Sequence, residues 1–172
     1  IIGMGRIGEA IAHRLEAFGV TPVYHTRTQR NHVSYTYYDN LLTMAADVDT
    51  LIVIVPGGPA TQNLINREVL EALGANGILV NVARGSVVDE PALIKALQDK
   101  VILSAGLDVF ADEPNVPQEL LDMEHVVLLP HVGSASVPCR NAMGQLVVDN
   151  VVSWFQTGTP VTPVSETPVP EH

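Results

Sequence analysis

Short runs of apolar, β-branched residues alternate with longer amphipathic stretches from residue 1 to residue 156. This alternation is typical of βαβ units, in which parallel strands form one sheet and helices cover both of its faces. The sequence therefore predicts an α/β fold built on a doubly wound parallel sheet. The predicted strands are residues 1–2, 22–25, 50–55, 77–82, 104–109 and 126–130, and the predicted helices are residues 6–18, 39–46, 66–73, 89–99 and 135–156.

A glycine motif, GxGxxG, occupies residues 3–8, between the first apolar residues and the first predicted helix. In that setting Gly3 permits a tight turn, Gly5 lets the backbone approach a pyrophosphate, and Gly8 lets helix and strand pack closely. The helix N-terminus then presents N–H groups and a positive dipole end to the phosphates. The motif indicates a Rossmann-type dinucleotide site; the alternative is a glycine-rich turn without a ligand. The contacts predicted here are Gly3, Gly5, Arg6, Ile7 and Gly8.

The segment after the second predicted strand decides which dinucleotide is expected. An NAD site usually carries Asp or Glu about 20 residues beyond the glycines, where it binds the ribose 2′-hydroxyl, whereas the first acidic residue after this strand is Asp39. Arg27 and Arg30, with the hydroxyls of Thr26 and Thr28, would instead attract a 2′-phosphate through charge-assisted hydrogen bonds. We therefore expect NADP(H) to be preferred over NAD(H). The alternative is that both arginines are solvated loop residues and the site does not discriminate.

Three polar residues each lie just after the end of a different predicted strand, namely Arg84, Glu113 and His131. Open parallel sheets bind ligands at the carboxyl ends of their strands, so these side chains are candidates for chemistry. An arginine can bind a planar carboxylate through two hydrogen bonds, and a histidine can transfer protons near neutral pH. Each residue taken alone also fits a solvated or structural role. Together they mark this edge of the sheet as a candidate active site.

The segments around these residues resemble those of a known family. NVARGSVVDEPAL, GLDVFADEP and LLPHVGSAS, in that order, are similar to the signature segments of the D-2-hydroxyacid dehydrogenases, and the resemblance runs from residue 1 to about residue 158. It implies that Arg84 holds the substrate carboxylate and polarises the keto oxygen, that His131 is the acid and base, and that Glu113 is the partner of His131. The residues that it implies near the cofactor, besides Arg84 and His131, are Val55, Pro56, Thr61, Val82, Ala83, Asp108, Gly133 and Ser134.

The same resemblance implies a reaction. The chain is expected to belong to an oxidoreductase that transfers a hydride between NADP(H) and a small 2-keto or 2-hydroxy acid. The stretch PGGPAT, residues 56–61, resembles the glyoxylate/hydroxypyruvate reductase branch, so reduction of one of these acids is expected. One alternative is a dinucleotide-sensing corepressor of the C-terminal-binding-protein type, which shares the fold but favours NAD(H). A formate dehydrogenase is another, but Glu113 beside the DEP motif fits the 2-hydroxyacid enzymes better.

The 172 residues are expected to hold one dinucleotide-binding domain, residues 1–156, followed by a Pro- and Thr-rich tail, residues 157–172, that cannot sustain a helix. Only two apolar residues precede the motif, against about five or six in an average strand, so the first strand is expected to be truncated. By the same resemblance, members of the family usually have a second domain that binds the substrate, and we expect it to lie largely outside these residues. We therefore expect little turnover from this chain alone, and by resemblance we expect a homodimer.

Composition narrows the choice of partners. A net charge of −10 disfavours binding to nucleic acid, which needs clustered Lys and Arg. No apolar run reaches the roughly 20 residues that span a bilayer, and no Cys or His spacing suggests a metal site. The single cysteine, Cys139, fits a reducing compartment, which we take to be the cytoplasm. The expected partner is a small acid substrate, with neither nucleic acid nor a membrane.

Overall fold

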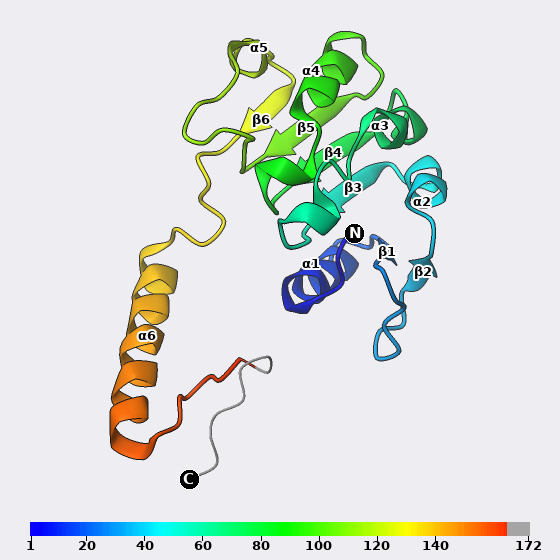
Figure 1. Ribbon diagram of the computed structural model, residues 1–172. Coiled ribbons are helices and arrows are strands. Elements are labelled where there is room, and N and C mark those ends of the chain that lie inside the picture. Colours follow the sequence, from blue (N-terminus) through cyan, green and yellow to red (C-terminus); the bar gives the residue numbers. More distant parts are fainter. Residues whose placement is uncertain (165–172) are drawn as a thin grey trace. The chain divides into compact units, whose positions relative to one another are not determined.

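The computed structural model describes residues 1–164 (Figure 1). Its strands are β1 (Val23–His25), β2 (Thr36–Tyr38), β3 (Thr50–Val53), β4 (Ile78–Asn81), β5 (Ser104–Leu107) and β6 (Val126–Leu128). β1 pairs with β2, and β3 to β6 lie side by side in chain order, all in parallel. Ile2 makes parallel bridges to both His25 and Val53, so the start of the chain joins the two groups of strands. The predicted α/β fold with a parallel sheet is confirmed.

The helices follow the strands in alternation. They are α1 (Arg6–Glu16), α2 (Leu41–Asp47), α3 (Arg67–Leu73), α4 (Glu90–Gln98), α5 (Gln118–Leu121) and α6 (Val137–Thr157), with single 3-10 turns η1 (Pro59–Thr61) and η2 (Gly85–Val87). Four of these helices, α2, α3, α4 and α6, begin after a polar residue whose side-chain oxygen accepts the backbone N–H three residues further on. These residues are Asn40, Asn66, Asp89 and Ser136. Such a cap satisfies one of the N–H groups that a helix leaves without an internal partner.

Apolar side chains pack on both faces of the sheet. Ile1 and Ile54 belong to a small cluster with Ala12 of α1, whereas their neighbours Ile2 and Val53 belong to a larger cluster that includes α2, α3 and α4. Successive side chains of a strand point to opposite faces, so α1 covers one face of the sheet and α2 to α4 cover the other. Figure 1 shows this separation, with α2, α3 and α4 in a row and α1 apart from them.

The structure adds two short elements to those predicted from the sequence, the strand β2 and the helix α5. β2 has the sequence TYY and lacks the aliphatic run that marks the other strands, and it forms because β1 offers a parallel edge beside it. α5 has four residues after Pro117, too few for a helical periodicity to be visible in the sequence. The predicted strand at residues 1–2 consists of the bridges made by Ile2.

The chain forms two compact units, one from Ile1 to His131 and one that begins at Val132 and contains α6. The second unit is largely exposed, including the apolar side chains of Val147, Val151 and Phe155. The predicted domain bounds, 1–156 and 157–172, stay a prediction, and residues 165–172 lie outside the described part of the chain. Within residues 1–164, no helix combines the length and the apolar character needed to cross a bilayer.

Candidate active site

The candidate residues of the first unit lie in segments that follow the carboxyl ends of the parallel strands. In chain order these segments begin at Gly3, Thr26, Ile54, Val82, Asp108 and Leu129. Because parallel strands all end at the same edge of a sheet, the six segments meet where open α/β sheets bind ligands. Gly133 and Ser134 belong to the second unit and are exposed, so their expected cofactor contacts stay predictions.

The glycine loop has the geometry that a dinucleotide requires. Gly3 has φ of +102°, and a Cβ there would lie 2.4 Å from the Ile54 carbonyl oxygen. A Cβ on Gly8 would lie 2.1 Å from the Gly3 carbonyl oxygen, so these two glycines are required by the protein's own packing. Gly5 is different, since a Cβ there would meet no protein atom within 4 Å. The open space beside Gly5, at the N-terminus of α1, fits the approach of a pyrophosphate.

The loop after β1 exposes two cations. Arg27 and Arg30 are both exposed, and neither has an ion-pair partner among residues 1–164. The Thr26 hydroxyl donates to the Thr28 carbonyl oxygen at 2.7 Å, so part of its hydrogen-bonding capacity is used within the loop. Two unpaired arginines on one short loop, with no carboxylate beside them, fit a phosphate better than a ribose hydroxyl.

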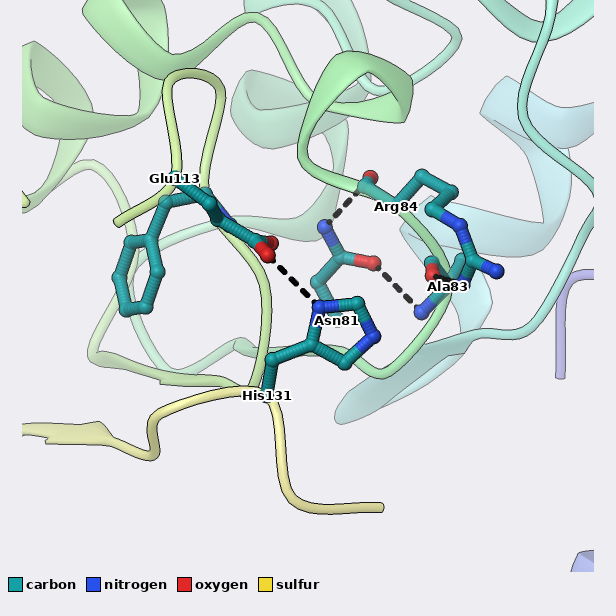
Figure 2. Close-up of polar contacts among 6 residues, drawn as sticks. Asn81, Ala83, Arg84, Glu113 and His131 are labelled. Atoms are coloured by element: carbon teal, nitrogen blue, oxygen red, sulfur yellow. Dashed lines mark hydrogen bonds and ion pairs between the residues drawn. The ribbon is translucent and has the colours of Figure 1, made fainter. Parts of the chain in front are cut away.

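The bend after β4 is held by a buried amide. Asn81 is 1% exposed; its Nδ2 donates to the Arg84 carbonyl oxygen at 3.1 Å, and its Oδ1 accepts the Ala83 N–H at 3.1 Å (Figure 2). The Arg84 guanidinium donates through one Nη to the Ala83 carbonyl oxygen at 2.6 Å and remains exposed. A Cβ on Gly57 would lie 2.9 Å from the Arg84 Cγ, so the loop after β3 packs on the stem of this arginine.

Gly85 joins the Arg84 bend to the Glu113 loop. A Cβ on Gly85 would lie 1.9 Å from the Phe110 carbonyl oxygen and 2.5 Å from the Ala111 nitrogen, so the two backbones touch here. The Phe110 N–H in turn donates to Glu113 Oε1 at 3.0 Å. The position of the Glu113 carboxylate is therefore fixed by the same contact that holds the segment of Arg84.

Glu113 and His131 form a close pair. Glu113 Oε2 lies 2.7 Å from His131 Nδ1, and the second ring nitrogen points away from the carboxylate (Figure 2). The hydrogen bond with His131 lowers the pKa of Glu113 below its usual 4.5; partial burial opposes this, while the Phe110 N–H and the charges of His131 and Arg84 add to it. His131 has φ of +54°, an uncommon conformation for a non-glycine residue that is found at functional sites.

An acid–base pair, an exposed arginine and a glycine loop thus share one sheet edge. Residues 1–133 match the model of the D-isomer specific 2-hydroxyacid dehydrogenase family, in its NAD-binding domain. The chain belongs to this family. As in other members, the domain is an NAD(P)-binding unit on a Rossmann-type parallel sheet, and the relatives of known function are oxidoreductases.

Several dehydrogenases and reductases of the family are closely similar to this chain. The NADPH-dependent glyoxylate/hydroxypyruvate reductase of Sinorhizobium meliloti, solved with NADP and malonate, is 59% identical, with a TM-score of 0.95 over 99% of this chain and 54% of that one. A glyoxylate/hydroxypyruvate reductase of Arabidopsis thaliana is 49% identical over 95% of this chain and 52% of its own length. A hydroxyphenylpyruvate reductase of Plectranthus scutellarioides is 48% identical over the same shares. The chain spans about half the length of these relatives.

The structure places the predicted dehydrogenase residues and adds others that sequence reasoning missed. Arg84, Glu113 and His131 lie at one edge of the sheet. Val82 and Ala83 directly precede Arg84, and the buried Asp108 begins the segment that leads to Glu113. The Thr61 hydroxyl donates to the Pro56 carbonyl oxygen at 2.7 Å. The exposed Arg6 and Ile7 begin α1. The missed residues are Asn81, Gly57, Gly85 and Phe110. A polar side chain that ends the apolar run of β4 was the one local signal for Asn81, while the others depend on tertiary contacts.

Proposed function

We propose that this chain is the cofactor-binding half of an NADPH-dependent reductase of small 2-keto acids, with glyoxylate and hydroxypyruvate as the expected substrates. The observation that carries the proposal is the Glu113–His131 pair at 2.7 Å beside the bend of Arg84. Support also comes from the relatives, since reductases named for these two acids are 49% and 59% identical to the chain. The exposed, unpaired Arg27 and Arg30 support the choice of NADPH.

Each side chain has a task in this proposal. Bound NADPH would supply the hydride. Arg84 holds the substrate carboxylate and polarises the keto oxygen, because its guanidinium is a fixed, permanently charged donor. His131 donates a proton to the keto oxygen through Nε2, since its Nδ1 is engaged by Glu113. Glu113 orients the imidazole through its contact with Nδ1 and places a carboxylate beside the ring.

A turnover assay of the complete enzyme tests this function. Glyoxylate, hydroxypyruvate and pyruvate are each offered with NADPH and with NADH, and oxidation of the cofactor is followed by its absorbance. We expect the first two acids to be reduced with the higher kcat/KM. A corepressor of the C-terminal-binding-protein type would bind NADH tightly and reduce none of the three at an appreciable rate, so the same assay separates the two functions.

The arginine loop should make the complete enzyme discriminate between NADPH and NADH. The complete enzyme should have a kcat/KM at least about tenfold higher with NADPH than with NADH, which corresponds to about 1.4 kcal/mol. Arg27→Asp should erase or reverse this preference, because a carboxylate repels the 2′-phosphate. Arg67→Asp makes the same change of charge on α3, where the arginine pairs with Glu71, and should leave the preference intact. Equal efficiency with both cofactors in the wild type would rule out the preference.

The pH dependence of reduction depends on Glu113. Its lowered pKa keeps the carboxylate ionised above pH 4.5, and the contact with His131 is lost only as the pH falls through that lowered value. Glu113→Gln should retain part of the activity, because the amide can still hold the imidazole ring. Its kcat/KM profile should lack the loss on the acid side that protonation of Glu113 causes in the wild type, since an amide does not titrate. The check is a pair of pH profiles for keto-acid reduction. An acid limb at the same pH in both proteins would end the assignment of Glu113 as partner of His131.

The 172 residues alone should bind cofactor but turn over little substrate. The relatives are about twice as long, and we infer that their remaining half completes the substrate site. Positioning of the substrate contributes several kcal/mol to catalysis, so an incomplete site is a large loss. Titration with NADPH and a turnover assay of the isolated chain test this.

We also propose that the complete enzyme is a cytoplasmic homodimer, which sedimentation would reveal as twice the mass of the subunit.

A further inference from the structure

The loop of Arg27 and Arg30 is tied at both ends by tyrosine hydroxyls. At one end the Arg30 N–H donates to the hydroxyl oxygen of Tyr24 at 2.8 Å, and that hydroxyl faces the Arg30 carbonyl oxygen at 3.4 Å. At the other end the Tyr37 hydroxyl donates to the Thr26 carbonyl oxygen at 3.1 Å. This loop, residues 26–30, is the first part of the connection from β1 to β2 (Figure 1), and Thr26 directly follows β1. Both attachments are made to the backbone of the loop.

The two tyrosines are themselves held firmly. Tyr24 of β1 and Tyr37 of β2 are partners in the parallel register, so their side chains leave the sheet on the same face. Their rings pack with centroids 5.4 Å apart in the cluster shared with α1, and Tyr24 is fully buried. Packing in an apolar cluster needs the rings but not the hydroxyls, since phenylalanine would fill nearly the same space. The hydroxyls are therefore explained by what they bind, which is the loop.

We propose that Tyr24 and Tyr37 are positioning residues for cofactor selectivity, which fix the loop so that Arg27 and Arg30 face the 2′-phosphate. A loop held at both ends loses less conformational freedom when it binds an anion, so more of the arginines' attraction appears as affinity. Because only NADPH carries the 2′-phosphate, the effect is confined to NADPH. This inference rests on the proposed NADPH preference, and it adds the two tyrosines that would help to create that preference.

The chain offers a matched control in the same strand. The Tyr38 hydroxyl donates to Asp47 Oδ2 at 3.1 Å, on α2, and has no bond to the loop. Tyr38→Phe therefore removes one tyrosine hydroxyl next to Tyr37 without touching the attachments of Arg30 and Thr26. The later part of the connection from β1 to β2 also contacts α1, since His32 Nε2 lies 2.8 Å from Glu9 Oε1. This pair is exposed to solvent, which screens it, so it holds the connection less firmly than the tyrosines do.

The test compares Tyr24→Phe, Tyr37→Phe, the double variant and Tyr38→Phe in the complete enzyme. Dissociation constants for NADPH and NADH are measured by fluorescence titration, with kcat at saturating NADPH and the melting temperature. Each loss of a hydrogen bond to the loop should raise the Kd of NADPH by about three- to tenfold. The Kd of NADH, kcat and the values for Tyr38→Phe should change by less than about twofold, the size of an ordinary surface substitution.

Three results would overturn the proposal. If the tyrosine variants bind NADPH and NADH with equally raised Kd values, the hydroxyls act on the fold and not on selectivity. If neither Kd is raised, the loop keeps its shape without the two hydroxyls. If the wild type binds both cofactors equally, the proposed NADPH preference has itself failed, and this is read from the wild type alone before any variant is considered. Should Tyr24→Phe fail to fold, Tyr37→Phe decides by the same criteria, since Tyr37 is only half-buried.

Discussion

Replacement of His131 by glutamine should lower kcat for keto-acid reduction by about 10²- to 10⁴-fold, the usual contribution of general acid catalysis. Glutamine retains a polar side chain of similar size but cannot deliver a proton to the keto oxygen. The Kd of NADPH should stay near that of the wild type, because the phosphates and the 2′-phosphate are expected to bind at the glycine loop and at Arg27 and Arg30. Single-turnover kinetics together with NADPH titration measure both quantities.

His125→Gln is the matched control for this variant. His125 is exposed directly before β6, on the same segment of chain as His131, and its backbone carbonyl rather than its ring accepts the Ser104 hydroxyl at 2.5 Å. We expect its kcat to equal that of the wild type. Reduction at close to the wild-type rate by His131→Gln would show that the proton comes from another group, and the roles assigned to Glu113 and His131 would both have to be abandoned.

Gly85→Ala should be nearly as damaging, although position 85 bears no functional side chain. The added methyl group would lie 1.9 Å from the Phe110 carbonyl oxygen, and both partners are backbone, so the two loops must separate. That separation displaces Arg84 on one side and, through the Phe110 N–H, the Glu113 carboxylate on the other. A displacement of about 1 Å at a catalytic group can cost about 10²-fold, so we expect kcat/KM to fall by at least that factor.

Gly106→Ala provides the comparison. A Cβ on Gly106, in β5, would meet only the Val80 methyl groups at 3.8 and 4.0 Å, which is ordinary contact. This variant should retain wild-type kcat/KM, while Gly85→Ala loses activity at temperatures where circular dichroism still reports a folded protein. If Gly85→Ala is as active as Gly106→Ala, the contact between the two loops does not position the site.

Local sequence signals predicted most of the regular structure. The predicted helix at residues 89–99 corresponds to α4, because the Asp89 cap and Pro91 are start signals that act within one helical turn. The tight turn at Gly3 and the close helix–strand contact at Gly8 likewise follow from a motif of six residues. β2 was missed because its three residues become a strand only beside β1, and no local pattern encodes a partner.

The sequence by itself determined the parallel α/β architecture, the glycine loop, the family and the residue types available for chemistry, since periodicity, caps and motifs are local properties of the chain. The tertiary structure decided how these residues meet. His131 reaches Glu113 across 18 residues of sequence, Gly85 touches the backbone of Phe110, and Tyr24 and Tyr37 hold the loop of the two arginines. Such contacts join segments on different strands, and their geometry is set by the packing of the whole sheet, which no single segment of sequence contains.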